Sequence, residues 1–382
     1  MGALSGYRVL DLTDEKGMLG ARLLADMDAE VIRIEKPGVD SSRNGAEFAY
    51  LNAGKRSVSL DLEKEEGREL FKKLVTTADV LIETSPPGYL GSLGLDYAKL
   101  SEINPGLVMA SITDFGQDGP YRDYKSSDLV VGALGGWLSV CGEPDAPLQP
   151  YGNQACRTAS LFAANAVLLA LWHRHATGRG QYIDISVMEC VVATLDHVLP
   201  RYFSEGVVSR RQGSRHWNDA FRIFRCQDGY ILVSLFQHWE TLVEWLDSEG
   251  MAEDLTDAKW LEREERLRGA DHIAEVLARW TSGHTAAELV EKGQLMRFPW
   301  AKVAALPEFL ASPQLAGRDF FAEVEVEGVK YQSPGAPFRM GRSPLKVGGR
   351  VPVVGEGNQD IYRGELGKSA SEMTALEKDG AI

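Results

Sequence analysis

Thiols are the most nucleophilic side chains of this sequence, and their spacing limits the chemistry they could do. The four cysteines stand far apart, with no CxxC pair and no zinc-ligand spacing: Cys141, Cys156, Cys190 and Cys226. We interpret them as reduced cytosolic thiols that mostly fill the core. A reactive Cys156 would need a base or cation to lower its pKa from about 8.5. The histidines of the same predicted helix, His173 and His175, lie roughly 25 Å along its axis at about 1.5 Å per residue. The simpler interpretation of Cys156 is a small residue at a helix start.

The familiar motifs of nucleotide and hydrolase chemistry are absent from the sequence. LTDEKGMLG follows the first predicted strand, so the GxGxxG dinucleotide fingerprint fails there. The chain contains no Walker A loop, no HExxH and no GxSxG nucleophile elbow. The chain therefore binds a ligand without these motifs, or binds none.

The first half of the sequence alternates strand and helix patterns, which indicates a parallel sheet wrapped by helices. Short apolar runs typical of buried strands cover residues 7–13, 30–36, 79–84 and 107–116. Amphipathic helical patterns cover 17–29 and 63–78. A long Ala/Leu-rich helix then ends at the glycines of ATGRG, and QYIDISV reads as a returning strand. We expect an α/β fold for this half.

A second region begins near Phe221. FRIFRCQDGYILVSL reads as two strands joined at a QDG turn, and helical patterns follow it. The sequence beyond Ala322 is rich in Gly, Pro and Val, and the polar tail after Arg363 is expected to be loosely held. These patterns divide the chain into 1–205, the first part of a large domain; 206–220, a linker; 221–321, a smaller domain; and 322–382, a segment that returns to the large domain.

The acidic composition argues against two classes of binding partner. A net charge of −14 over 382 residues disfavours nucleic acid and anionic membranes, since both repel an acidic surface. The N-terminus has no basic region followed by an apolar run, and no apolar stretch approaches the roughly 20 residues that span a bilayer. We expect a cytoplasmic protein that binds neither nucleic acid nor membrane. An anionic ligand needs a locally basic or amide-lined pocket.

A series of segments in fixed order resembles the class III coenzyme A transferase family, of the CaiB/BaiF type. The series begins with VLDLT…LLADMDAEVIRIEKPG and continues through LNAGKRSVSLDL, PPGYLGSLGLDYAKL and SSDLVVGALGG to ATGRGQYIDISVME. It extends weakly to FRCQDGYILV and SPGAPFRM, so the resemblance spans nearly the whole chain.

The resemblance implies a large Rossmann-like α/β domain, a smaller α+β domain, and two chains interlocked like linked rings. It also implies CoA transfer between an acyl-CoA and a small carboxylic acid, with no covalently bound cofactor. In that chemistry a carboxylate side chain carries first the acid, as a mixed anhydride, and then CoA, as a thioester.

Cys156 occupies the position of the family's nucleophilic aspartate, counted back from ATGRG, and residues 146–183 contain no Asp or Glu. A thiol there would take up the acyl group and release CoA, which is acyl transfer and not CoA transfer. The related racemases add a histidine before the aspartate of the SSDLVV segment, and Ser127 stands there instead. We interpret Asp128 as structural, a helix cap.

The resemblance also places CoA-binding residues, and several depart from the family pattern. The cations are Lys36, Arg43, Lys55 and Arg56, and the turn residues are Thr84, Ser85 and Tyr89. Thr84 and Ser85 replace an Asn-Phe pair, and Ser92 stands where the family has an arginine, so a phosphate partner is lost. The alternative for Lys55 and Arg56 is a solvated loop.

Three hypotheses follow from these departures. The chain is the non-catalytic subunit of a heteromeric transferase of the benzylsuccinate type, beside a homologous subunit that keeps the aspartate. Alternatively, it is a homodimer with altered chemistry on a CoA thioester, or an inactive CoA-binding or scaffold protein.

Overall fold

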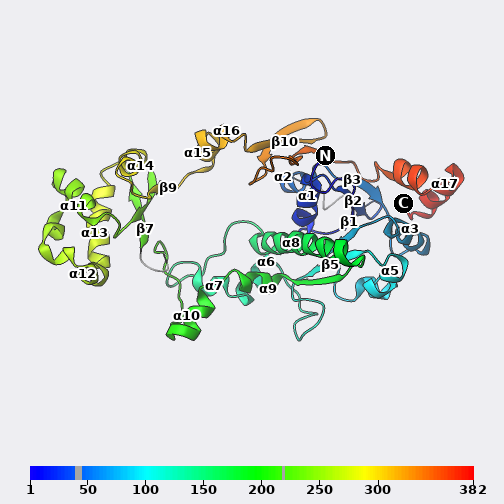
Figure 1. Cartoon of the computed structure of the whole chain (residues 1–382), viewed down its shortest axis with the longest axis horizontal. Helices are drawn as coiled ribbons and strands as arrows, with labels where there is room; N and C mark the ends of the chain where they lie inside the picture. The colour runs from blue at the N-terminus through cyan, green and yellow to red at the C-terminus, as the bar shows by residue number, and fades with distance from the viewer. Residues whose placement is uncertain (39–44, 217–219) are drawn as a thin grey trace. The chain divides into compact units, whose positions relative to one another are not determined.

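The computed structural model describes residues 1–38, 45–216 and 220–382 (Figure 1). The chain forms two compact units. The first contains residues 1–137, 149–207 and 314–382, and the second contains 138–148 and 208–313. No sequence pattern sets residues 138–148 apart from their neighbours in the first unit.

A six-stranded parallel sheet, in the order β3-β2-β1-β4-β5-β6, forms the centre of the first unit. Its strands are β1 (Arg8–Leu12), β2 (Glu30–Glu35), β3 (Arg56–Ser59), β4 (Val80–Glu83), β5 (Val108–Thr113) and β6 (Tyr182–Ser186). β4 and β5 are buried along their whole length, as expected of parallel strands covered on both faces. The predicted α/β domain with a Rossmann-like parallel sheet is therefore confirmed.

Helices cover both faces of this sheet. Val9 and Leu10, neighbours in β1, point to opposite faces and pack into separate buried clusters. The Val9 face carries α1 (Met18–Asp26), α6 (Asp128–Leu134), α8 (Gln154–Thr177) and α9 (Val187–Ala193). The Leu10 face carries α3 (Glu65–Val75), α4 (Tyr89–Ser92), α5 (Tyr97–Ile103) and α17 (Ala370–Asp379).

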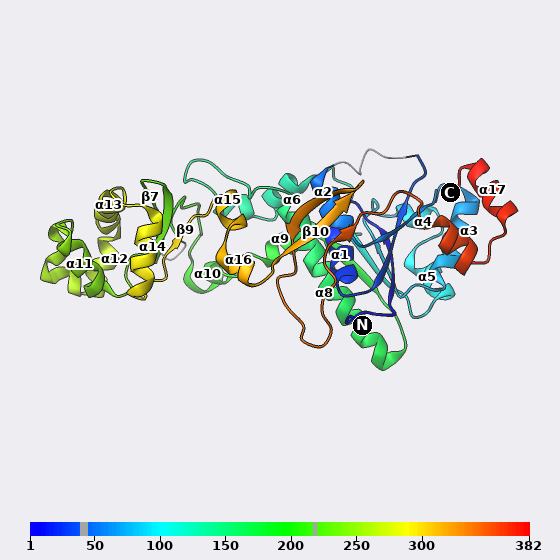
Figure 2. The same cartoon turned by 90° about the horizontal axis from the view of Figure 1, so that it is seen from above.

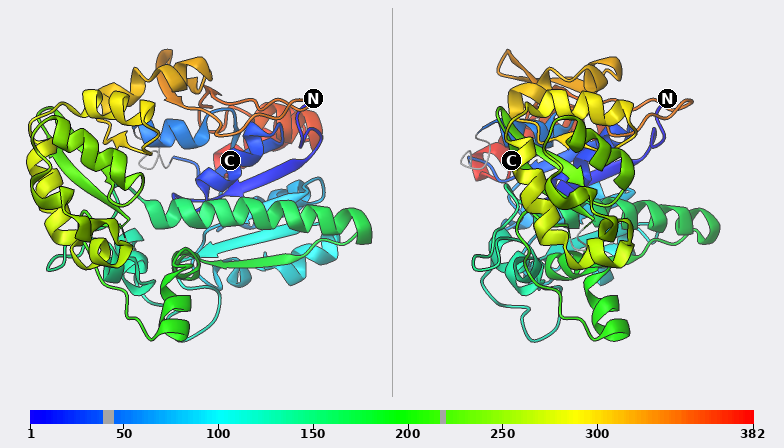
Figure 3. Two further views of the ribbon diagram at one scale, coloured as in Figure 1. Left: turned by 60° about the vertical axis from the view of Figure 1, so that its left-hand side comes forward. Right: turned by 90° about the vertical axis from the view of Figure 1, so that its left-hand side faces the viewer.

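The long helix α8 crosses α1 at close range and lies against β5 (Figure 3). A Cβ atom at Gly20 would lie 2.9 Å from the Ser160 carbonyl oxygen, so glycine permits this approach. With 24 residues, α8 is long and apolar enough to cross a bilayer, which the sequence expectation did not allow for. Half of its most apolar stretch is buried within the protein, as in the core helix of a globular domain.

The remaining elements of the first unit are shorter. A three-stranded sheet contains β10 (Phe321–Val326), β11 (Val329–Pro334) and β12 (Gly349–Arg350). The β10–β11 hairpin lies beside α2 (Figure 2). The other helices are α2 (Ala46–Asn52), α10 (Val198–Glu205) and η3 (Gln359–Glu365), while α7 (Trp137–Val140) and α16 (Pro313–Gly317) contain residues of both units.

The C-terminal segment is packed, so the prediction of a loosely held tail is wrong. Its apolar residues join the buried cluster on the Leu10 face: Ile361, Tyr362, Met373, Leu376, Ala381 and Ile382. Ser369 and Glu372 form a capping box at the start of α17. The polar composition of this segment hides an amphipathic helix, because a few apolar residues on one face are enough to pack a helix against the core.

The second unit combines a small antiparallel sheet with helices, as expected of an α+β domain. Its strands are β7 (Phe221–Cys226), β8 (Gly229–Ser234) and β9 (Ala301–Lys302), and the predicted hairpin joins the first two. Its helices are α11 (Trp239–Ser248), η1 (Glu253–Thr256), η2 (Ala258–Leu261), α12 (Arg263–Arg268), α13 (Ala270–Thr281), α14 (Ala286–Leu295) and α15 (Leu306–Leu310). Trp245, Trp280 and Trp300 pack together in its core, with ring centroids of the first two 4.8 Å apart.

Candidate functional site

The strand order of the large sheet reverses between β1 and β4. Loops that leave neighbouring strands diverge at such a point, and open α/β sheets bind ligands in the resulting crevice at the carboxyl ends of the strands. A cavity of about 420 Å³ lies there. It is lined by Asp14 and Lys16 after β1, by residues 84–87 after β4, by Thr113 at the end of β5, and by Asp114 and residues 122–126 after it. We call this cavity the crevice.

Hydrogen bonds and ion pairs connect the loops that line the crevice. The backbone N–H of Asp14 donates to Oγ1 of Thr84 at 2.8 Å, which joins the loops after β1 and β4. Nζ of Lys16 lies 2.5 Å from Oδ2 of Asp14. Burial disfavours the charge of Lys16, but the carboxylates of Asp14 and Asp114 hold its pKa above the ordinary value. Burial raises the pKa of Asp114. The crevice thus holds a charged lysine between two acidic groups.

Cys156 lies in the first turn of α8, beside the loop that carries Lys16. Oγ of Ser160, one turn later, donates to the Lys16 carbonyl oxygen at 2.7 Å and fixes the helix against this loop. Cys156 is buried, with 3% of its surface exposed, and does not line the crevice itself. Position and burial agree with the interpretation of a small residue at a helix start.

Asp128 acts as the predicted cap, but for a helix distant in sequence. Its Oδ1 accepts a hydrogen bond of 2.9 Å from the backbone N–H of Cys156, and its Oδ2 accepts one of 2.6 Å from Nε2 of Gln149. The helix that begins at Asp128 is capped by Ser127 instead. A carboxylate of α6 therefore satisfies a free amide at the N-terminus of α8.

These surroundings keep the Cys156 thiol protonated. Burial raises its pKa far above the usual value, and the adjacent Asp128 carboxylate raises it further. The opposite arrangement, a cation or a free helix N-terminus, is what activates a thiol. Cys156 therefore lacks the properties of a reactive cysteine.

The turn residues predicted to contact CoA gather at the carboxyl edge of the sheet, with one of the cations. Thr84 and Ser85 line the crevice, and Tyr89 begins the following helix. Lys36 directly follows β2 at the same edge, where Nζ lies 2.8 Å from Oε2 of Glu63. A hydrogen bond to Glu63 raises the pKa of Lys36, and burial raises that of Tyr89.

Lys55 and Arg56 do not join this group. Nζ of Lys55 donates to Oδ2 of Asp11 at 2.8 Å, to Oδ1 of Asn52 at 2.9 Å and to the Met18 carbonyl oxygen at 3.2 Å, which uses all three of its N–H groups. Burial lowers its pKa to about 8. Lys55 is buried, not in a solvated loop.

Arg56 lies near the edge where the strands begin. It pairs there with Glu30, at the start of β2, and with Glu365, which Arg8 also contacts. The sheet therefore separates Arg56 from the crevice within this chain. Arg43 lies outside the described residues.

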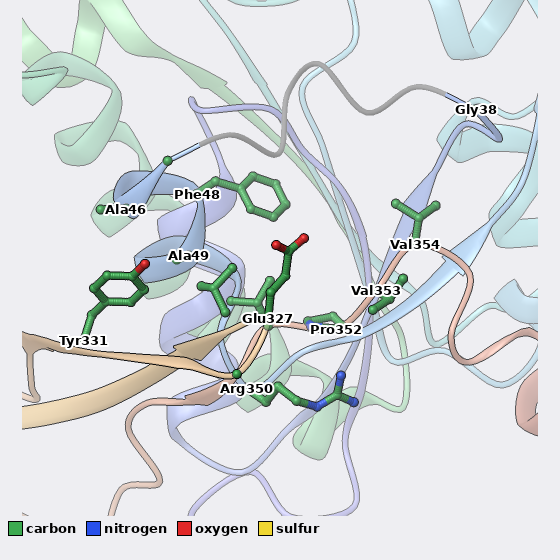
Figure 4. Close-up of a pocket in the computed structure, with 14 residues that line it drawn as sticks. Gly38, Ala46, Phe48, Ala49, Glu327, Tyr331, Arg350, Pro352, Val353 and Val354 are labelled. Carbon is green, nitrogen blue, oxygen red and sulfur yellow. The ribbon is translucent and has the colours of Figure 1, made fainter.

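A second cavity, of about 690 Å³, lies between α2, the β10–β11 hairpin and residues 350–354 (Figure 4). Phe48, Ala49 and Val351–Val354 give it a largely apolar wall, with Glu327 and Arg350 at its side. The guanidinium of Arg350 pairs with Glu356. Glu327 is the one carboxylate among the described residues that line this cavity, and none of these residues lines the crevice.

Sequence reasoning did not single out Lys16, Asp114, Arg122 or Lys125, which all line the crevice. A signal was present, because Asp114 lies near the end of a predicted strand and the other three residues follow one, and the carboxyl ends of parallel strands meet at one edge. What the sequence does not give is the strand order, which decides that the loops after β1, β4 and β5 are neighbours.

A doubly wound parallel sheet with a charged crevice at its strand-order reversal defines a class of α/β proteins whose members bind ligands through strand-to-helix loops. The sequence matches CoA-transferase family III over residues 4–358, and the chain belongs to that family.

Relatives match over nearly the whole chain. Succinyl-CoA:(R)-benzylsuccinate CoA-transferase subunit BbsE of Thauera aromatica is 34% identical over 99% of this chain and 98% of its own length. Succinyl-CoA:mesaconate CoA-transferase of Haloarcula hispanica is 32% identical over 99% of both chains. The crystal structure of a CAIB/BAIF family protein from Brucella suis superposes with a TM-score of 0.86, at 29% identity, over 96% of this chain and 99% of that protein.

Proposed function

We propose that this chain serves CoA transfer between a CoA thioester, such as succinyl-CoA, and a carboxylic acid, as the subunit that lacks the nucleophile in a heteromeric cytoplasmic transferase. The environment of Cys156 is the observation that carries this proposal. Burial raises the pKa of this thiol, and the Asp128 carboxylate raises it further, so the thiol stays protonated. The relative BbsE is itself named as a subunit, which is consistent with a shared role.

The chemistry explains why the missing carboxylate matters. A carboxylate attacks the thioester carbonyl carbon, the C–S bond breaks, and the CoA thiolate leaves an acyl anhydride on the enzyme. The thiolate then attacks the carbonyl carbon of the enzyme's own carboxyl group, which releases the first acid and leaves an enzyme–CoA thioester. The second acid attacks that thioester and releases the CoA thiolate. The thiolate then attacks the new acyl carbon of the resulting anhydride, which forms the new CoA ester and frees the enzyme carboxylate. A cysteine at this position cannot carry CoA in this way, because its sulfur would keep the acyl group.

The proposed partner is a homologous chain that keeps the aspartate at the position of Cys156. Two such chains would interlock as linked rings, the arrangement that the sequence resemblance implies. This chain then contributes architecture and substrate binding, while its partner contributes the nucleophile.

Reconstitution tests the proposal. The full chain is purified alone and together with an aspartate-bearing homologue, and each sample receives succinyl-CoA and a labelled acid such as benzylsuccinate or mesaconate. We expect the labelled CoA ester to form with the two chains together and not with this chain alone.

Two controls locate the nucleophile. Replacing the partner's aspartate by Ala should abolish transfer, whereas Cys156→Ala in this chain should leave it within about twofold, since a protonated buried thiol takes no part. Robust exchange by this chain alone, lost in Asp114→Asn, would overturn the proposal and place a nucleophilic carboxylate in the crevice.

A further inference from the structure

Six charged side chains are buried in the first unit, and they come from β1, α1, β2 and the residue before β3. Three are cations and three are acids, and each is less than a tenth exposed: Asp11, Arg22, Asp26, Arg33, Glu35 and Lys55. Taking charges out of water is costly, and well-packed apolar residues of similar volume often give the same stability or more. The backbone groups that such a cluster contacts are therefore a better guide to its role than stability is.

Lys55 contacts both ends of the loop between β1 and α1, residues 13–17, which we call the first loop. Its Nζ donates to Oδ2 of Asp11 at 2.8 Å. Oδ1 of the same carboxylate accepts a hydrogen bond of 3.0 Å from the backbone N–H of Thr13 and one of 2.5 Å from the Thr13 hydroxyl. Nζ also donates to the carbonyl oxygen of Met18, the first residue of α1, at 3.2 Å. One ammonium therefore fixes the beginning of the first loop through Asp11 and its end directly.

Lys55 is itself held in place by α2. Its remaining N–H donates to Oδ1 of Asn52 at 2.9 Å, and Nδ2 of Asn52 donates to the Phe48 carbonyl oxygen at 3.0 Å. Arg33 supports the same region, because its Nη1 donates to the Thr13 carbonyl oxygen at 3.1 Å. Arg33 thus contacts the beginning of the first loop, whereas Lys55 contacts its end as well. Burial lowers the pKa of Lys55 to about 8, so at pH 7 the ammonium keeps its charge and all three N–H groups.

The first loop positions groups on two of its sides. Asp14 and Lys16 line the crevice. On the side of α8, Oγ of Ser160 donates to the Lys16 carbonyl oxygen at 2.7 Å. Nη1 of Arg157, in the first turns of the same helix, donates to the Glu15 carbonyl oxygen at 3.2 Å. A movement of the first loop would therefore shift the charged lysine of the crevice and the start of α8 together.

We propose that Lys55 is a positioning residue: its ammonium holds the first loop in the form that places Lys16 in the crevice and supports the start of α8. In this role Lys55 touches no ligand and acts through the loop. Its hold on the loop can be measured without any substrate, whereas the benefit of that hold for CoA transfer rests on the proposed function.

Hydrogen exchange of the full-length chain at pH 7 measures how firmly the first loop is held. The backbone N–H of Gly17 donates to the Asp14 carbonyl oxygen at 3.0 Å inside the loop, so exchange there reports its opening. The double variant Asp11→Asn/Lys55→Met removes one buried acid and one buried cation and keeps the lengths of both side chains. We expect its first loop to exchange about tenfold faster than that of the native chain, or more, while β5 exchanges as before.

Free energies of unfolding separate positioning from a general loss of stability. Lys55→Met alone leaves the Asp11 carboxylate with Arg33 at 3.6 Å and should lower the urea midpoint, and the double variant should recover much of that loss. An ion pair that serves stability alone would regain native loop exchange at the same time. We expect the fast exchange to persist, because methionine offers no N–H group to the Met18 carbonyl oxygen. Lys72→Met, which removes an ammonium from the surface of α3, is the matched control and should change neither quantity.

Iodoacetamide labelling tests whether the first loop also supports the start of α8. In the double variant Cys156 should react about fivefold faster than in the native chain, or more, while Cys190 of α9, which is also buried, is the internal reference. Native exchange of the first loop in the double variant would overturn the inference, and so would exchange that rises equally in the loop and in β5. Fast loop exchange with native labelling of Cys156 would remove α8 from the role assigned to Lys55.

Transfer by the two-chain sample is a separate measurement. With the double variant of this chain, the KM for succinyl-CoA should rise about tenfold with a smaller change in kcat, since the proposed nucleophile belongs to the partner. Fast loop exchange with native KM and kcat would overturn the positioning role in the reaction. A native two-chain sample without transfer would sink the proposed function alone, because loop exchange still decides whether Lys55 holds the loop.

Discussion

The backbone amide of Cys156 and the carboxylate of Asp128 are joined by a hydrogen bond of 2.9 Å, so that one acidic group of α6 caps α8. The same carboxylate adds to the effect of burial in raising the pKa of the Cys156 thiol. Asp128 therefore both anchors the N-terminus of α8 and lowers the reactivity of the Cys156 thiol. Several measurable consequences follow from this pairing and from other buried groups of the first unit.

Cys156 should resist thiol reagents in the folded protein. At pH 8 we expect iodoacetamide to label Cys141, which is partly exposed, well before Cys156, because only thiolates react quickly and the Cys156 thiol is buried and protonated. Peptide mass spectrometry over a time course measures both rates, and unfolding in urea should make them similar. Faster labelling of Cys156 than of Cys141 would revive the hypothesis of altered chemistry at this cysteine.

An aspartate introduced at position 156 should lower the stability of the protein while Asp128 is present. Cys156→Asp places a second carboxylate beside the first, and we expect a loss of about 1–3 kcal/mol in the free energy of unfolding at pH 7.5. Asp128→Asn, which keeps a capping side chain, should cost less on its own and should recover much of the loss in the double variant. Urea denaturation of the four proteins gives the coupling energy. Additive losses would show that the two positions do not interact.

Asp26 should make stability fall as pH rises between about 4 and 6. Burial raises its pKa to about 6, although Arg22 opposes this. Between the ordinary carboxyl pKa and 6 the folded state binds more protons than the unfolded state, so the stabilisation is complete below about 4 and lost as pH rises through 6. Two pKa units correspond to about 3 kcal/mol.

The variant Asp26→Asn isolates this contribution. It should be more stable than the native chain at pH 7.5 by about 1–2 kcal/mol, less than the full shift because Arg22 loses its partner, which lies 3.5 Å away. The advantage should disappear near pH 4. Asp360→Asn, at an exposed acid, is the matched control. A difference between Asp26→Asn and native chain that does not change with pH would refute the assigned pKa.

The sequence predicted the elements better than it predicted the site, for a physical reason. A strand such as β5 is buried on both faces and reads as one apolar run, so local sequence reveals it. Lys55 reads as a loop residue because its partner Asp11 lies 44 positions earlier, and no local pattern shows the ion pair. Arg122 and Lys125 likewise belong to a loop of ordinary polar composition. They line the same cavity as Thr84 and Lys16 only because of the strand order, which is a property of the whole sheet.

The C-terminal helix should contribute measurably to the stability of the first unit. Met373 is 2% exposed and packs into the cluster on the Leu10 face of the sheet, so Met373→Ala should lower the free energy of unfolding by about 2–4 kcal/mol. Ser369→Ala removes the capping box and should cost about 1 kcal/mol. Lys378→Ala, at an exposed position of the same helix, should change stability by less than about 0.5 kcal/mol. Urea denaturation measures all three. If Met373→Ala unfolds at the same urea concentration as the native chain, α17 is frayed in solution. The sequence-based expectation of a loosely held tail would then be correct.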